Sequence, residues 1–128
     1  MIRNYTISSN LVLSIGDNVN VDLVDSILIY LKIENNSKIE IALYTYMGDF
    51  RVKFTFEDIR FLELNLDLTE DHALDSIEFA YRGYDSNIYS FSDDSEGDVI
   101  SLRFLFSDGR SLHVGSRLSI VEVSAQRI

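Results

Sequence analysis

The carboxylates are the residues with the widest choice of chemistry, because few other reactive side chains are present. The chain has 21 Asp and Glu residues, two His and no Cys. The lack of Cys excludes a disulfide framework and a thiolate nucleophile. Neither His72 nor His113 has a second His or a Cys nearby, whereas structural zinc needs about four closely spaced ligands. We therefore expect no metal and no cofactor, with His72 in a turn and His113 in a strand.

Calcium binding fits the composition better than zinc binding does, because the loop SDDSEGD at residues 92–98 is rich in carboxylates. The EF-hand pattern requires an acid at its first position and a Gly at its sixth. With Gly97 at the sixth position, the first is Ser92, so this pattern fails. A calcium loop of another type, in a module that binds carbohydrate, stays open as the alternative function.

The composition gives little support for a catalytic function. Paired carboxylates could hydrolyse a glycosidic bond, but the chain has no Trp to line a sugar cleft. It also lacks the G-x-S-x-G motif of a serine nucleophile. We therefore expect a protein that is not an enzyme, and we keep a small carboxylate hydrolase as a weaker hypothesis.

Negative charge is concentrated in residues 61–102, which we call the acidic segment. It holds 11 of the 21 acids and one base, Arg82, so its net charge is −10. The rest of the chain, which we call the balanced part, has ten acids and ten bases (21 − 11 and 11 − 1). Acids this close together repel one another and cost stability. Charge of one sign is useful when a cationic partner must be attracted.

The acidic segment also contains three tyrosines, at positions 81, 84 and 89. Tyrosine is common at binding hot spots, although each of these could instead pack as an ordinary strand aromatic. A pI of about 4.4 argues against nucleic acid and anionic membranes, which attract clustered Lys and Arg. The candidate partner-binding residues are Glu70, Asp71, Tyr81, Tyr84, Asp85, Tyr89, Asp93, Asp94, Glu96 and Asp98.

The elements that must position these residues are β-strands, because apolar residues recur at every second position. Residues 50–56 and 100–106 each place four apolar side chains on one face. Residues 62–68, 111–114 and 118–123 are further expected strands. Residues 21–32 also match helical spacing, but the isoleucines of 26–34 favour a strand there.

Turn residues separate these strands. The alternation changes phase at Asp58 and Ile59, which predicts a bulge or a corner. Asp108-Gly109 is typical of a two-residue type I′ hairpin, and Gly115-Ser116 predicts another turn. Residues 69–75 are the one helix-like stretch, with Thr69 as its N-cap.

These patterns predict an all-β fold in one domain, residues 1–128. The expected architecture is an antiparallel β-sandwich or rolled barrel of about nine or ten strands, with at most one short helix. No apolar run is long enough to cross a bilayer, and we find no signal peptide. Together with the lack of Cys, this leads us to expect a cytoplasmic location.

Two stretches, FTFEDIRFLELNL and VISLRFLFSDGRSLHVGSRLSIVEV, resemble the β-sandwich immunity proteins of bacterial polymorphic-toxin and contact-dependent growth inhibition systems. The resemblance covers roughly the second half of the chain. It implies a stoichiometric inhibitor that covers the active site of a cognate toxin, often a cationic nuclease. It carries over no catalytic residue, because these families share none.

Overall fold

The structure is a computed structural model. It describes residues 2–8, 10–35, 37–46, 49–65, 74–82, 89–91 and 100–125, with the backbone alone for Ile2, 74–82 and 89–91. The strands are β1 (Ile2–Arg3), β2 (Thr6–Ile7), β3 (Val12–Ile15), β4 (Val19–Asp22), β5 (Ile27–Glu34), β6 (Lys38–Tyr44), β7 (Phe50–Asn65), β8 (Leu74–Arg82), β9 (Tyr89–Phe91), β10 (Ile100–Phe106) and β11 (Ser111–Ala125). The described residues contain no α-helix, so the all-β prediction is confirmed.

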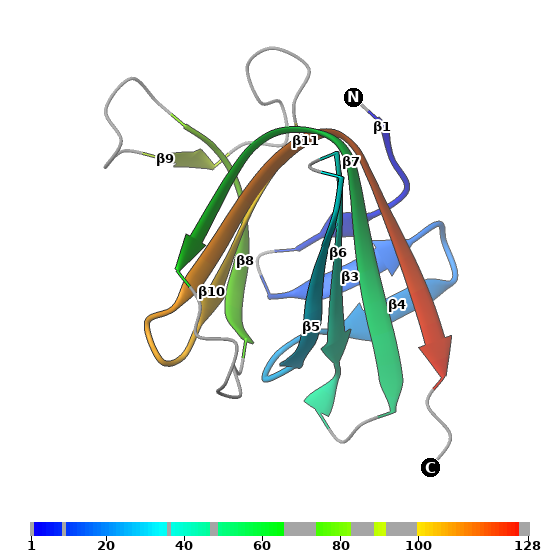
Figure 1. The fold of residues 1–128 in the computed structure, drawn as a ribbon. Coiled ribbons are helices and arrows are strands. Elements are labelled where there is room, and N and C mark those ends of the chain that lie inside the picture. Colours follow the sequence, from blue (N-terminus) through cyan, green and yellow to red (C-terminus); the bar gives the residue numbers. More distant parts are fainter. Residues whose placement is uncertain are drawn as a thin grey trace.

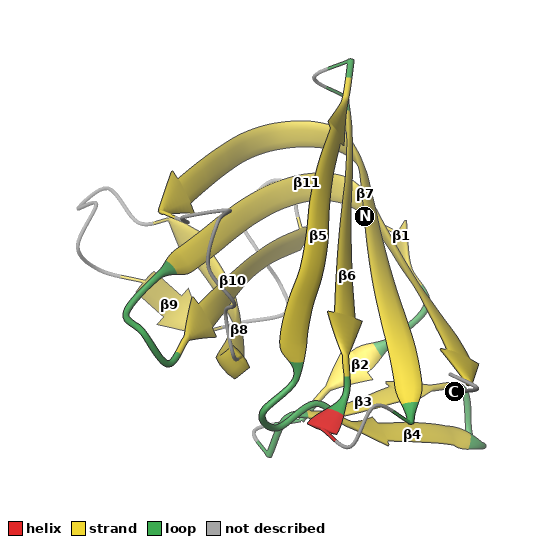
Figure 2. Ribbon diagram, turned by 60° about the horizontal axis from the view of Figure 1, so that its bottom comes forward, coloured by secondary structure: helices red, strands yellow, loops and turns green. Residues whose placement is uncertain are grey.

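Two antiparallel sheets make up the fold (Figure 1). The large sheet has the strand order β5-β6-β7-β11-β10-β8-β9, and β1 is added to β11 by a short parallel pairing. The small sheet has the order β2-β3-β4. It crosses the open side of the arched large sheet (Figures 1 and 2). The arrangement is sandwich-like, in agreement with the coarser part of the prediction.

Eight of the strands have four or more residues, fewer than the nine or ten expected. The expected strand at 50–56 and the described residues 62–65 of the one expected at 62–68 form one continuous strand, β7. Those expected at 111–114 and 118–123 are likewise one strand, β11. The turn predicted at Gly115-Ser116 is therefore wrong, because the chain bends there without leaving the sheet.

The bend is a β-bulge shared by β7 and β11, and we call it the corner. Gly115 pairs with Phe61 and Ser116 with Ile59, so Arg60 is the extra residue. Asp58 has a φ of +55°, which is unusual for a residue with a Cβ. The bulge or corner predicted at Asp58 and Ile59 is therefore confirmed. A Cβ at position 115 would overlap the ring of Phe61, so the corner requires Gly there.

One hydrophobic core fills the space between the sheets. Phe54 lies at its centre: its ring meets Tyr5 edge-to-face at 5.6 Å and Phe104 at 5.3 Å, and stacks on Phe56 at 6.2 Å. Leu13 of the small sheet belongs to the same cluster. Aromatic pairs of this geometry add about 0.5–1.5 kcal/mol each beyond their burial.

Local predictions had mixed outcomes. Residues 27–34 form a strand, as the isoleucines indicate. The hairpin at Asp108-Gly109 exists, but Asp108 lacks the positive φ that a type I′ turn requires, and only Gly109 has one, +83°. Gly109 N–H donates to the carbonyl of Phe106 at 3.0 Å, as in a type I turn followed by a G1 bulge. The helix expected at 69–75 lies outside the described residues up to position 73, and positions 74 and 75 belong to β8.

Candidate functional site

Most of the predicted partner-binding residues lie outside the part of the chain that the structure describes. Two have a described backbone: Tyr81 in β8 and Tyr89 in β9. These strands pair so that Tyr81 is opposite Ser90 and Tyr89 is opposite Arg82. The two tyrosines thus occupy adjacent rungs of one ladder. Outside the description are Glu70, Asp71, Tyr84, Asp85, Asp93, Asp94, Glu96 and Asp98.

Strand order brings the described pieces of the acidic segment together. They are residues 61–65 of β7, all of β8 and β9, and the start of β10. All of them belong to the half of the large sheet beyond the corner. We call this half the acidic end, and the half with β5, β6 and residues 50–57 of β7 the balanced end.

At the balanced end, bases pair with acids from the balanced part of the chain. Lys32 Nζ is 2.8 Å from Glu34 Oε1. Two further pairs are longer, at 3.4 Å for Lys53–Glu122 and 3.6 Å for Lys38–Glu40. Side-chain hydrogen bonding to Glu34 raises the pKa of Lys32, and the reciprocal bond lowers the pKa of Glu34.

At the corner, one acid lies between two bases. Asp58 Oδ2 is 3.4 Å from Arg60 Nη2 and 3.8 Å from Arg117 Nε. Both bases lie outside the acidic segment and both have this carboxylate as a partner. Beyond the corner, the backbone register sets Arg103 of β10 opposite Glu78 of β8.

Sequence analysis missed a buried polar pair at the acidic end. Ser101 Oγ is 2.6 Å from His113 Nε2, and both residues are 3% exposed. His113 also meets the Phe61 ring edge-to-face at 4.8 Å, and its strand register sets it opposite Glu63 and Arg103. The alternation along β10 and β11 could have predicted that Ser101 and His113 share one side of the sheet, because both lie on the face opposite the Phe and Leu core.

A Ser–His pair at this distance has the geometry of a nucleophile and its base. Here both groups are almost completely excluded from solvent. Burial favours a structural function, joining β10 to β11 through a satisfied hydrogen bond. His113 is thus a strand residue, as expected. His72 lies outside the described residues.

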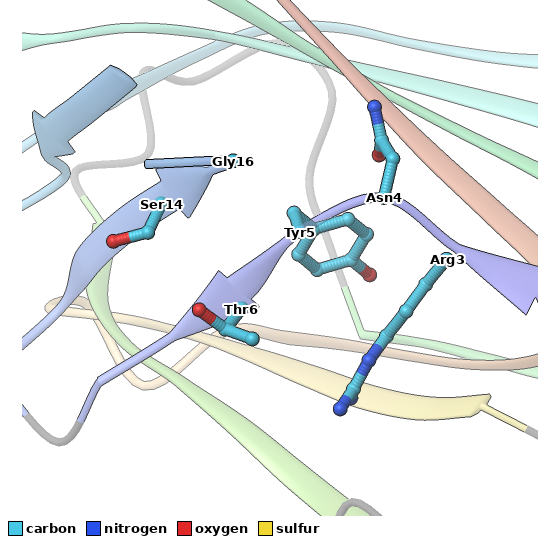
Figure 3. Close-up of a pocket in the computed structure, with 6 residues that line it drawn as sticks. All are labelled: Arg3, Asn4, Tyr5, Thr6, Ser14 and Gly16. Atoms are coloured by element: carbon cyan, nitrogen blue, oxygen red, sulfur yellow. The ribbon is translucent and has the colours of Figure 1, made fainter. Parts of the chain in front are cut away.

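One open pocket of about 330 Å³ lies where the chain passes from the large sheet to the small one (Figure 3). Its lining residues are Arg3, Asn4, Tyr5, Thr6, Ser14 and Gly16. Two of these hold the chain to β11. The Asn4 side chain donates to the carbonyl of Val121 at 3.0 Å and accepts from its N–H at 2.9 Å.

Tyr5 provides the second attachment beside this pocket. Its hydroxyl is 2.7 Å from Ser119 Oγ, and burial raises the Tyr5 pKa far above its ordinary value. These contacts serve the fold and leave the pocket shallow and polar.

Two features are absent from the described part of the chain. It contains no group of three or more His, Asp or Glu side chains placed to hold an ion. None of its segments is a helix with the length and apolarity that a bilayer demands. The loop at 92–98, where a calcium site stays open as an alternative, lies outside the description. No family model, curated protein or solved structure matches this chain.

Proposed function

We propose that this protein is an immunity-type inhibitor that binds a cationic toxin domain, such as a nuclease, with its acidic end. One observation carries the proposal. The strand order gathers the described parts of the acidic segment at one end of the large sheet, while Lys32, Lys38 and Lys53 pair with acids at the other end. The described parts of the acidic segment thus lie away from these ion pairs, which supports the proposal.

Inhibition of this kind needs no catalytic group. Net negative charge at one end attracts a positively charged surface, which raises the association rate when salt is low. Tyrosines within the contact would supply apolar area and hydrogen bonds at a small entropy cost. Once bound, the inhibitor covers the toxin active site and excludes its substrate.

The test uses the candidate toxin domain encoded by the neighbouring gene, co-expressed with the inhibitor. We expect Asp93→Lys combined with Asp94→Lys to abolish growth protection. The same change should slow association with the purified domain about tenfold or more, because steering contributes on this scale. The wild-type rate should fall steeply with salt, and that of the variant should fall less.

A matched control distinguishes the effect of where the charges lie from the effect of the change in net charge. Asp17→Lys combined with Glu57→Lys also changes the net charge by four, and both residues are exposed outside the acidic segment. This control should keep protection and most of the association rate. Equal association rates and equal protection for the two double variants would refute an acidic docking face.

A further inference from the structure

The hairpin between β10 and β11 contains the one Asp-Gly pair of the chain, Asp108-Gly109, and no Asn is followed by Gly. An Asp-Gly bond can rearrange without an enzyme, because the main-chain nitrogen of the Gly can attack the carboxyl carbon of the Asp. Gly is the most reactive residue in this second position, since it has no Cβ to block the approach. The sequence therefore contains a candidate site of spontaneous chemical change at this turn.

Both residues of the pair are open to solvent at the tip of the hairpin. Asp108 and Gly109 are exposed, and a Cβ built on Gly109 would meet no atom within 4 Å. The φ of Gly109 is +83°, in a region that Gly enters without strain. Water therefore reaches the reacting atoms, and no neighbouring side chain crowds the Gly109 nitrogen.

The Asp108 side chain is turned toward the peptide that follows it. Its Oδ1 accepts the main-chain N–H of Arg110 at 3.0 Å, which is the hydrogen bond of an Asx-turn. Arg110 is itself held in place, because its Nη1 donates to Asn65 Oδ1 at 3.1 Å. The carboxyl group of Asp108 thus lies on the side of the chain where the Gly109 nitrogen is found.

One contact opposes the attack. Gly109 N–H donates to the carbonyl of Phe106 at 3.0 Å, so the nitrogen must leave this hydrogen bond before it reacts. Exposed loop tips open locally at a small cost in free energy. We therefore expect the folded hairpin to slow the reaction and not to prevent it.

We propose that Asp108 isomerises to isoaspartate in the folded protein. The Gly109 nitrogen forms a bond to Asp108 Cγ, and the hydroxyl of the protonated carboxyl group leaves as water with the proton of the nitrogen. Water then adds to one of the two carbonyls of the resulting succinimide ring. Cleavage at Cγ restores Asp108, whereas cleavage at its main-chain carbonyl routes the backbone through Cγ and leaves a free α-carboxylate. The inference does not depend on the proposed inhibitory function.

Isomerisation lengthens the backbone of the turn by one carbon atom. The ladder of β10 and β11 extends to the pair Leu105–Ser111, and Phe106 N–H donates to the carbonyl of Arg110 at 2.9 Å. The added atom lies between these paired residues, so the tip must rearrange. We expect the isomerised form to unfold at a lower urea concentration than the original.

Peptide mapping of aged protein tests the proposal. Purified protein is kept for several weeks at neutral pH, and trypsin then releases residues 104–110 as one peptide whose only acid is Asp108. We expect a second form of this peptide with the same mass and a different retention time. L-isoaspartyl methyltransferase should methylate the second form and not the first. Asp108→Glu should give no second form, because Glu would have to close a larger ring.

Asp25-Ser26 is the matched control within the chain. Asp25 is also exposed, and Ser26 N–H likewise donates within a turn, to the carbonyl of Leu23 at 3.1 Å. Ser26, however, is fully buried. Both sites should isomerise in urea, whereas in folded protein only Asp108 should. The proposal fails if aged folded protein contains no isoaspartate at position 108, or if folding slows the two sites by the same factor.

Discussion

The two ends of the large sheet handle charge in different ways. At the balanced end, acids and bases alternate on neighbouring strands and form exposed ion pairs such as Lys32–Glu34 and Lys53–Glu122. At the acidic end, the described polar contacts include the buried Ser101–His113 hydrogen bond and an exposed one from Arg110 to Asn65. The boundary between the ends is the corner, and the acidic segment begins at Phe61, directly after the extra residue Arg60.

This coincidence shows how one strand can serve two environments. Before the corner, β7 carries Arg51 and Lys53 on its outer face, and Arg51 lies over the Tyr30 ring at 5.3 Å. After the corner, the same strand carries Glu63 opposite His113. A bulge changes the direction of the strand and of its side chains. Residues on the two sides of the corner therefore lie in different halves of the large sheet.

The largest expected effect comes from breaking the corner itself. Gly115→Ala adds a Cβ that overlaps the Phe61 ring, and overpacking of this kind costs about 1–3 kcal/mol. Chemical denaturation should report the loss, and combining it with Phe61→Leu should recover part of it. If Gly115→Ala is neutral alone, the close approach of Phe61 does not constrain the corner.

A second glycine serves as the control for that experiment. Gly109 has a φ of +83°, but a Cβ there would meet nothing within 4 Å. Gly109→Ala should therefore cost about 1–2 kcal/mol through backbone strain alone. Unlike Gly115→Ala, it should not respond to Phe61→Leu.

An effect of similar size is expected from the buried pair at the acidic end. Ser101→Ala removes the hydrogen bond to His113 Nε2, which should lower the free energy of unfolding by about 1–3 kcal/mol. Ser14→Ala also removes a hydrogen bond, to Asn20 at 2.7 Å, but in an exposed position. It should cost less than about 0.5 kcal/mol. Equal losses in urea titrations of both variants would mean that burial adds nothing to the Ser101 bond.

The smallest effect belongs to the balanced end and depends on pH. Lys32 lowers the pKa of Glu34 in the folded state, so the pair stabilises the fold above the ordinary Glu pKa of 4.5. That contribution is lost as the pH falls through the lower folded pKa. NMR titration should give a Glu34 pKa below 4.5, and Lys32→Gln should return it to the ordinary range. An unchanged titration in Lys32→Gln would show that Lys32 does not cause the shift.

Much of the fold was predictable because period-two patterns depend on burial, which acts residue by residue. Val52, Phe54 and Phe56 are fully buried, as their alternation predicts. Phe50 has the same spacing but is 39% exposed, because it begins the strand at the rim of the sheet. Alternation predicts which side of the sheet a side chain lies on, but not how completely it is buried.

Continuity across the corner was harder to predict. Gly115-Ser116 has the composition of a turn, yet it is a bulge because β7 continues alongside and supplies Phe61 to cover the glycine. Gly115 and its partner Phe61 are 54 positions apart in the sequence (115 − 61), and local composition contains no information about that partner. The same limit applies to Ser101 and His113, whose contact depends on the register of β10 with β11.

The candidate site was predictable only as a charge imbalance. Composition locates 11 acids between residues 61 and 102, and strand order brings the described parts of that segment to one end of the large sheet. Which carboxylates face a partner depends on side-chain direction, and a count of charges does not specify direction. The ion pairs of Asp58 with Arg60 and Arg117 likewise arise from a bulge geometry.

The position of β11 has a consequence for synthesis. It lies between β7 and β10 in the sheet, although it follows both in the chain. A nascent chain leaving the ribosome must therefore wait with two apolar strand edges unpaired until residues 111–125 emerge. Such edges are prone to aggregate, so a chaperone that binds exposed strand edges should be needed most just before β11 is made.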